Sequence, residues 1–198
     1  MTGPDTDQGA AWMAAWQAGD ESAFDALVRA HADRVFALLT RFLGPVPQRE
    51  DLVQEVFLRV IRARDTYVPS ARFTTWLYRI VFNLAANERE KQRLRRTLSI
   101  DASRNDGEEG GFDLADDNAP DPEADLSRLD LVAAVRTAIE ALPERQRMAL
   151  ILAKYEGLPY HEIGEVLGVS EKAVKSTVHR AREALRESLA PFVREEVA

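Results

Sequence analysis

Two parts of the chain repeat apolar residues at the spacing of an α-helix. In the first part, Ser22 is the predicted N-cap of a helix that ends at Gly44. A second helix is predicted to begin near Gln48, and a third covers residues 73–96 after a break that contains proline and serine. We therefore expect residues 11–96 to form one helical domain.

The second predicted helix is amphipathic. Its apolar stripe consists of Leu52, Val53, Val56, Phe57, Val60 and Ile61. Its polar face includes Asp51, Gln54, Glu55 and Arg59. Such a division predicts that one face packs on a core while the other meets solvent or a partner.

The second helical part covers residues 128–192. Helices are predicted over residues 129–142, 144–155, 160–167 and from 171 to about 189. Neither part shows the alternation of apolar and polar residues that is typical of strands. The predicted fold class is all-α, with two small helical domains.

Residues 97–127 lack this periodicity and are rich in acidic residues, glycine and proline. Between Asp101 and Asp125 there are ten acidic residues and one basic residue, a net charge of −9, so the formal charge of −7 leaves +2 for the rest of the chain. Such a segment buries too little apolar surface to offset the entropy of ordering. We predict an acidic flexible linker between the two domains.

Composition excludes several classes of protein. The 198 residues include no cysteine, which rules out disulfides and thiolate chemistry. No signal peptide or apolar run of about 18 residues occurs, so we expect a cytoplasmic protein without membrane insertion. His31, His161 and His179 lie on separate predicted helices, and His31 is interpreted as a helix-face residue. We expect no catalytic residue, no metal site and no cofactor.

Residues 161–179 have the pattern of a helix-turn-helix. Gly168 permits a tight turn, Ser170 caps the second helix, and Val174 and Val178 point inward. This orientation exposes a polar set made of Ser170, Glu171, Lys172, Lys175, Ser176, His179 and Arg180. Such side chains suit base edges and phosphates in a DNA groove. The alternative is a helical bundle with an ordinary solvated face.

Three segments together resemble extracytoplasmic-function sigma factors. Residues 51–60 and 73–83 resemble conserved region 2 of that family, and residues 142–147 with the helix-turn-helix resemble region 4, in the family's order. The resemblance implies a bacterial protein that binds core RNA polymerase and promoter DNA and helps to open it. It implies that Asp51, Gln54, Glu55 and Arg59 dock on the clamp of the largest polymerase subunit.

The resemblance also assigns the third helix and its preceding loop to the minus-ten element. An unpaired base would be held there by stacking and hydrogen bonds. The candidates are Ser70, Ala71, Arg72, Tyr78, Arg79, Asn83 and Asn87, with Arg89, Lys91, Arg93 and Arg95 on phosphates. Asn83 is preferred because an amide both donates and accepts hydrogen bonds.

Region 4 would read the minus-thirty-five element through the polar set of the helix-turn-helix. The chain has Lys172-Ala173 where family members often have Gly-Thr, and Thr177 where they often have arginine. These departures affect the expected base preference and leave the expected fold unchanged.

The sequence leaves open the role of the acidic linker, the full set of partners and two alternative functions. The acidic linker either mimics RNA in the polymerase cleft or is a solubilising spacer, and it could compete with DNA for the basic patches. The resemblance implies a possible anti-sigma factor as a further partner. The alternatives are a helix-turn-helix regulator without a sigma role and a helical adaptor that binds polymerase but not promoters.

Overall fold

The computed structural model describes residues 7–44, 46–100 and 122–195, and every regular element in those residues is helical. The first group is α1 (Gln8–Gln17), α2 (Glu21–Leu43), α3 (Arg49–Arg62), the 3₁₀ turn η1 (Arg64–Thr66) and α4 (Phe73–Ile100). The second is α5 (Pro122–Ala141), α6 (Glu144–Lys154), α7 (Tyr160–Leu167) and α8 (Glu171–Glu195). We call these groups the N-terminal unit and the C-terminal unit.

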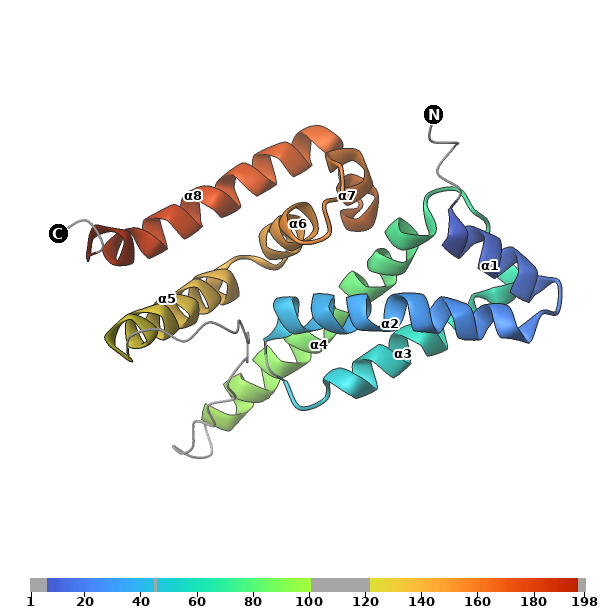
Figure 1. Ribbon diagram of the computed structural model, residues 1–198, viewed down its shortest axis with the longest axis horizontal. Helices are drawn as coiled ribbons and strands as arrows, with labels where there is room; N and C mark the ends of the chain where they lie inside the picture. Colours follow the sequence, from blue (N-terminus) through green and yellow to red (C-terminus); the bar gives the residue numbers. More distant parts are fainter. Residues whose placement is uncertain (1–6, 45, 101–121, 196–198) are drawn as a thin grey trace.

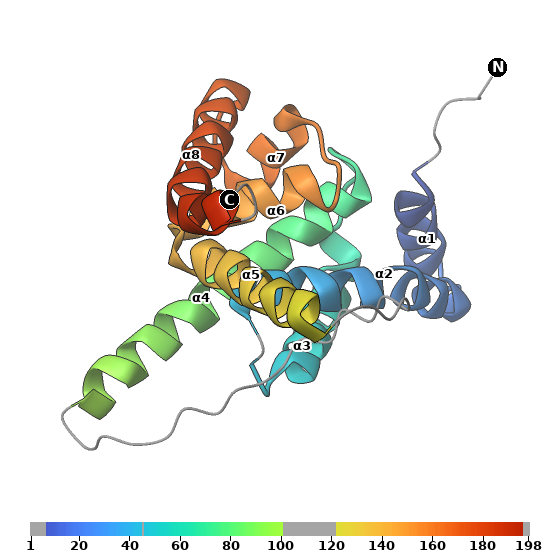
Figure 2. The ribbon, with the colours of Figure 1, turned by 60° about the vertical axis from the view of Figure 1, so that its left-hand side comes forward.

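The N-terminal unit is built on α2. This long helix packs against α1, α3 and α4, and the last turns of α4 project beyond the other helices (Figures 1 and 2). Asp7 joins two helix starts, since one carboxylate oxygen accepts from the Ala10 N–H at 3.1 Å and the other from the Phe73 N–H at 2.5 Å. The Trp76 ring contacts the rings of Tyr67 and Phe73, at centroid distances of 4.9 and 5.6 Å.

The C-terminal unit lies against one side of the N-terminal unit (Figure 1). Within it, α8 packs on α5, α6 and α7, while α7 contacts α4 and α6 contacts α2. One continuous hydrophobic core includes buried residues of both units, such as Phe42 and Leu77 on one side and Met148 and Ile163 on the other. Within the described residues, none of the helices is long and apolar enough to cross a membrane.

The structure corrects several predicted helix ends. The N-cap of α2 is Asp20, whose carboxylate accepts from the Ser22 N–H at 3.0 Å, so Ser22 is not the cap. A separate helix, α1, precedes α2, and Gly19 has a φ of 105° in the turn between them. The last helix runs past residue 189 to Glu195, with Pro191 inside it.

The predicted linker is shorter than residues 97–127. Helix α4 continues to Ile100, and α5 begins at Pro122, where the fixed φ of proline suits a first helical turn. The remaining linker residues, 101–121, lie outside the described residues, and so do the expectations about RNA mimicry and competition with DNA.

Candidate nucleic-acid interface

The turn between α7 and α8 depends on two glycines. Gly168 ends α7 in the left-handed region, with a φ of 65°. Gly164 lies so close to the turn that a Cβ atom there would be 2.6 Å from the Val169 carbonyl oxygen. At the start of α8, the Ser170 hydroxyl accepts from the Ala173 N–H at 3.3 Å. This confirms the predicted turn and cap, whereas the requirement for Gly164 was not predicted.

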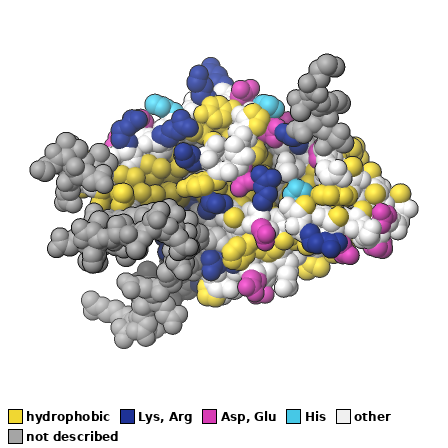
Figure 3. All heavy atoms as spheres, in the orientation of Figure 1, with side chains coloured by type: hydrophobic (Ala, Val, Ile, Leu, Met, Phe, Trp, Pro, Cys, Tyr) yellow, Lys and Arg dark blue, Asp and Glu magenta, His cyan; other side chains and the backbone are white. Residues whose placement is uncertain are grey.

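The two faces of α8 differ as the pattern predicts. Val174 and Val178 are buried, together with Ile163 and Leu167 of α7. All the predicted minus-thirty-five residues are exposed: Ser170, Glu171, Lys172, Lys175, Ser176, His179 and Arg180. Lys and Arg side chains gather along the upper edge of the face in Figure 3, over α8. The outer face of α8 therefore presents cations and polar groups, the kinds of side chain that contact phosphates and base edges.

Thr177, one of the departures from the family pattern, is directed to its own helix. Its hydroxyl donates to the Ala173 carbonyl at 2.8 Å, and the residue is half-buried. A hydroxyl engaged in this way is less available to a base edge. Thr177 therefore offers this edge of α8 neither a cation nor an unengaged hydroxyl.

Three minus-ten candidates form an exposed row on α4. Arg79, Asn83 and Asn87 follow one another at intervals of four residues, so they lie on one face of the helix. Ser70 is also exposed, on the loop before α4. This row could contact an extended single strand.

Two other minus-ten candidates are engaged by the C-terminal unit. Arg72 lies 3.7 Å from a carboxylate oxygen of Glu162. Tyr78 is 1% exposed, and its hydroxyl donates to the Glu156 carboxylate at 2.6 Å. Burial, with this hydrogen bond as the second cause, raises the pKa of Tyr78 above its ordinary value. Tyr78 is therefore withdrawn from solvent, whereas the Arg72 side chain is 52% exposed and remains open to solvent beside Glu162.

The basic part of α4 is interleaved with acidic residues. Lys91 lies 3.9 Å from Glu88, and the Arg93 guanidinium donates two hydrogen bonds of 2.9 Å to Glu90. The hydrogen bond from Arg93 lowers the pKa of Glu90. Arg89 donates to the backbone carbonyl of residue 140 in α5, at 2.9 Å. These acidic neighbours reduce the positive charge that the basic cluster presents to phosphates.

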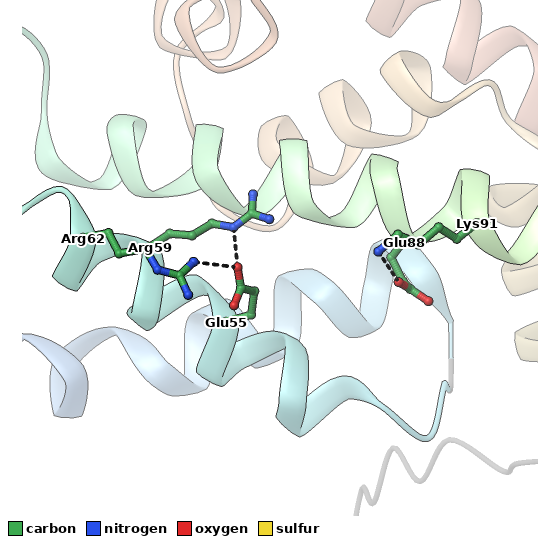
Figure 4. A network of polar contacts seen from close by, with 5 residues as sticks. All are labelled: Glu55, Arg59, Arg62, Glu88 and Lys91. Carbon is green, nitrogen blue, oxygen red and sulfur yellow. Dashed lines mark hydrogen bonds and ion pairs between the residues drawn. The ribbon is translucent and has the colours of Figure 1, made fainter.

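The candidate polymerase surface lies on α3. Asp51 and Gln54 are exposed, and the Glu55 carboxylate accepts from Arg59 at 2.9 Å and from Arg62 at 3.4 Å (Figure 4). The hydrogen bond from Arg59 is the main reason that the pKa of Glu55 is lowered.

The apolar stripe of α3 was predicted one residue too wide. Ile61 is 42% exposed and Leu58 is 44% exposed, so Ile61 does not belong to the core. Leu58 lies one helical turn from Gln54 and Glu55, and Ile61 lies one turn from Leu58. Exposed apolar side chains next to charged ones are typical of protein–protein interfaces. Leu58 was missed because a lone apolar residue on a polar face carries no periodic signal.

Two family descriptions match the chain. Residues 27–95 match "Sigma-70 region 2", and residues 133–185 match "Sigma-70, region 4". The N-terminal unit contains the first match and the C-terminal unit contains the second.

Two curated relatives match nearly the full length of the chain. The RNA polymerase sigma-H factor of Pseudomonas aeruginosa is 36% identical over 179 residues, which are 90% of this chain and 92% of that protein. The ECF RNA polymerase sigma-E factor of Escherichia coli is 36% identical over 181 residues, again 90% and 92% of the two chains. The chain belongs to the extracytoplasmic-function sigma factors. Its role is promoter recognition in the initiation of transcription.

A solved structure shares the fold of this sigma factor. It is the sigma factor RpoE in complex with the anti-sigma factor NepR from Bartonella quintana, with a TM-score of 0.63 and 22% identity. The match covers 84% of this chain and 96% of that one. Within the described residues of this sigma factor, no three histidine or acidic side chains are grouped as a metal ion would require.

Proposed function

We propose that the two units divide the work of promoter recognition, with region 2 in residues 11–96 and region 4 in residues 128–192. Region 4 reads duplex DNA of the minus-thirty-five element through the outer face of α8. The observation that carries this proposal is the exposure of all the predicted residues on the second helix of the helix-turn-helix. Their cations contact phosphates, and the polar side chains near the helix start contact base edges.

Region 2 contributes two surfaces. The exposed row of α4, with Asn83 at its centre, contacts the separated strand of the minus-ten element. The polar set of α3, Asp51 with Gln54, Glu55 and Arg59, docks on the clamp of core RNA polymerase, with Leu58 and Ile61 beside it. These residues act by binding, and none of them serves as a catalyst.

Core polymerase is not the only partner that we propose. A sigma factor of this fold is bound to an anti-sigma factor in its solved structure. An anti-sigma factor for this chain would compete with polymerase and DNA by covering the same surfaces. A cytoplasmic location follows from the proposed role, because RNA polymerase acts there.

Gel filtration with core RNA polymerase tests the polymerase surface. The wild-type chain is expected to co-elute with polymerase, and the variant Asp51→Ala/Gln54→Ala/Glu55→Ala is expected to elute alone. The control variant Asp25→Asn/Glu187→Gln changes exposed acidic residues on α2 and α8 and is expected to co-elute. Co-elution of the α3 variant would overturn the assignment of this surface.

A further inference from the structure

The loop before α4 is attached to α1 at both of its ends. This loop, residues 67–72, connects η1 to α4 and carries the minus-ten candidates Ser70, Ala71 and Arg72. Helix α1 lies against both η1 and the start of α4 (Figure 1). A helix of 10 residues is about 15 Å long, so α1 reaches from the element before the loop to the element after it.

The contact at the α4 end is made by the Asp7 carboxylate. One of its oxygens accepts from the Ala10 N–H and caps α1, while the other accepts from the Phe73 N–H at 2.5 Å. Phe73 is the first residue of α4, and the N–H groups of a first helical turn have no acceptor within their own helix. A negative charge at this position also interacts favourably with the helix dipole. Asp7 therefore ties the start of α4, and with it the end of the loop, to α1.

The contact at the other end is made by the Gln17 side chain. Its amide nitrogen donates to the carbonyl oxygens of Arg64 and Tyr67, at 2.6 and 3.1 Å. The Arg64 guanidinium adds a second link, since it donates to the Trp16 carbonyl and lies 4.7 Å from the centroid of the Trp16 ring. Gln17 thus ties the carbonyl of Tyr67, the first residue of the loop, to the last turn of α1.

Close packing sets the distance between α1 and α4 as well. Gly9 of α1 is buried, and a Cβ atom on it would lie 2.4 Å from Cδ1 of the Phe73 ring. Phe73 is fully buried, and its ring contacts that of Trp76. Trp76 in turn lines a small cavity with Ser70 and Ala71. The position of α1 is therefore transmitted to the loop residues through packed rings and through the hydrogen bonds at its two ends.

We propose that α1 positions the loop that reads the minus-ten element, and that Asp7 and Gln17 are the positioning residues. We call these two residues the α1 anchors. They hold residues 67–72 in one conformation before DNA arrives, so the loop does not have to be ordered when an unpaired base binds. A loop held in one conformation also adapts less readily to a different base, which raises selectivity. This inference rests on the proposed minus-ten role of the loop and α4.

Hydrogen exchange tests whether the anchors hold the loop. The variant Asp7→Ser/Gln17→Met keeps a good N-cap residue for α1 and the length of the second side chain, but serine has a single oxygen and methionine cannot donate. In the full chain, mass spectrometry is expected to show that the amides of residues 67–76 exchange about tenfold faster than in the wild type, because fewer contacts oppose local opening. The amides of α3 and α8 are expected to keep their wild-type rates.

The matched control is Asp20→Ser/Gln48→Met. Asp20 caps α2 through the Ser22 N–H, as Asp7 caps α1, and Gln48 is exposed and makes no capping hydrogen bond with its side chain. The control therefore loses the same two groups away from the loop. Its loop amides are expected to exchange at the wild-type rate.

Promoter selection tests whether the anchored loop sets the base preference. Random DNA is selected with core polymerase and either the wild type, the anchor variant or the control. In the anchor variant, the preference for the best base over the others at the minus-ten positions is expected to fall about tenfold. The preference at the minus-thirty-five positions and the co-elution with polymerase are expected to stay unchanged. A helix that only stabilised the fold would instead reduce binding to both promoter elements together.

The outcomes separate this inference from the proposed function. If the loop amides exchange at the wild-type rate in the anchor variant, or equally fast in the control, the anchors are refuted. If the loop opens faster but the minus-ten preference is unchanged, the positioning role is refuted. If the loop opens faster but the wild type selects no minus-ten sequence, the proposed role of α4 fails while the anchoring of the loop by α1 stands.

Discussion

The two DNA-binding surfaces of this sigma factor are presented in opposite ways. On α8 of region 4, every predicted residue points to solvent. On α4 and its loop in region 2, some predicted residues are exposed, whereas Tyr78 is buried and Arg72 is paired with region 4. The surface that we propose for duplex DNA is exposed, and the surface that we propose for the minus-ten strand is partly occupied by region 4.

This difference follows from what the two surfaces must bind. A recognition helix enters a groove as a rigid body and needs only an exposed face. A strand-separating surface must offer pockets, stacking partners and cations, and such features also attract other parts of the protein. Tyr78 and Arg72 therefore find carboxylates of region 4 when no DNA is bound. Substitutions confined to one region test each of the two surfaces separately.

The largest expected effect is on affinity for duplex DNA, which we propose that the outer face of α8 binds. Replacing Lys172, Lys175 and Arg180 with alanine removes three cations from the outer face of α8. Since a hydrogen bond to a charged group is worth about 1.5 kcal/mol or more, the loss of these phosphate contacts is expected to cost roughly 3 kcal/mol, or about 100-fold in affinity for duplex promoter DNA. Fluorescence anisotropy with a selected promoter duplex measures this loss.

Co-elution of the same variant with core polymerase is the control for folding. It is expected to be unchanged, because α3 lies in the other region. A variant that keeps its affinity for duplex DNA would show that the exposed face of α8 is an ordinary solvated surface.

The next largest effect is on stability, and it concerns the turn between α7 and α8. Gly164→Ala places a Cβ atom 2.6 Å from the Val169 carbonyl oxygen, and this overpacking is expected to cost about 1–3 kcal/mol of stability. Gly168→Ala is the matched comparison, because its φ of 65° is strained for alanine but no atom lies within 4 Å of the new Cβ. Its cost is expected to be about 1 kcal/mol. Urea unfolding followed by circular dichroism ranks them, and a larger loss at Gly168 would contradict the close approach.

Local signals predicted most of the fold but not the contact between the regions. The turn at Gly168, the cap at Ser170 and the burial of Val174 each depend on residues nearby in the chain. The sequence therefore predicts all three correctly. Glu162 has the sequence environment of a surface glutamate, and only its position against Thr75 makes it a buried one. The burial of His31 could not be predicted from the sequence either. It was expected on a helix face, but it is 8% exposed and packs in the core beside Phe73.

The burial of His31 predicts a dependence of stability on pH. Desolvation lowers the pKa of His31, with Arg34 as a further cause and Asp7 acting in the opposite direction. Because the folded state favours the neutral ring, its stability is fully present above the unfolded pKa of about 6.5 and is lost as the pH falls toward the lower folded value. Melting temperatures between pH 8 and 5.5 are expected to fall in the wild type and to fall less in His31→Leu.

His161→Gln is the control for this titration, because His161 is exposed on α7. Its melting temperatures are expected to follow those of the wild type across the same range of pH. If His31→Leu and the wild type lose stability in parallel, the ring of His31 is not the group responsible.

The smallest expected effect concerns the ionisation of Tyr78, which lies on the surface of region 2 that region 4 covers. Burial and the hydrogen bond to Glu156 raise the pKa of Tyr78, so the neutral phenol is favoured while region 4 is in place. The sign follows from linkage: this stabilisation of the contact is complete below about pH 10, the ordinary value for a phenol, and is lost as the pH rises further. The difference between ultraviolet titrations of the wild type and Tyr78→Phe gives the ionisation of this one residue. Its midpoint is expected above pH 10 and should move toward 10 in the Glu156→Gln/Glu162→Gln background. A midpoint that is the same in both backgrounds would mean that Tyr78 is buried by region 2 alone, and the contrast between the exposed and covered surfaces would then not depend on region 4.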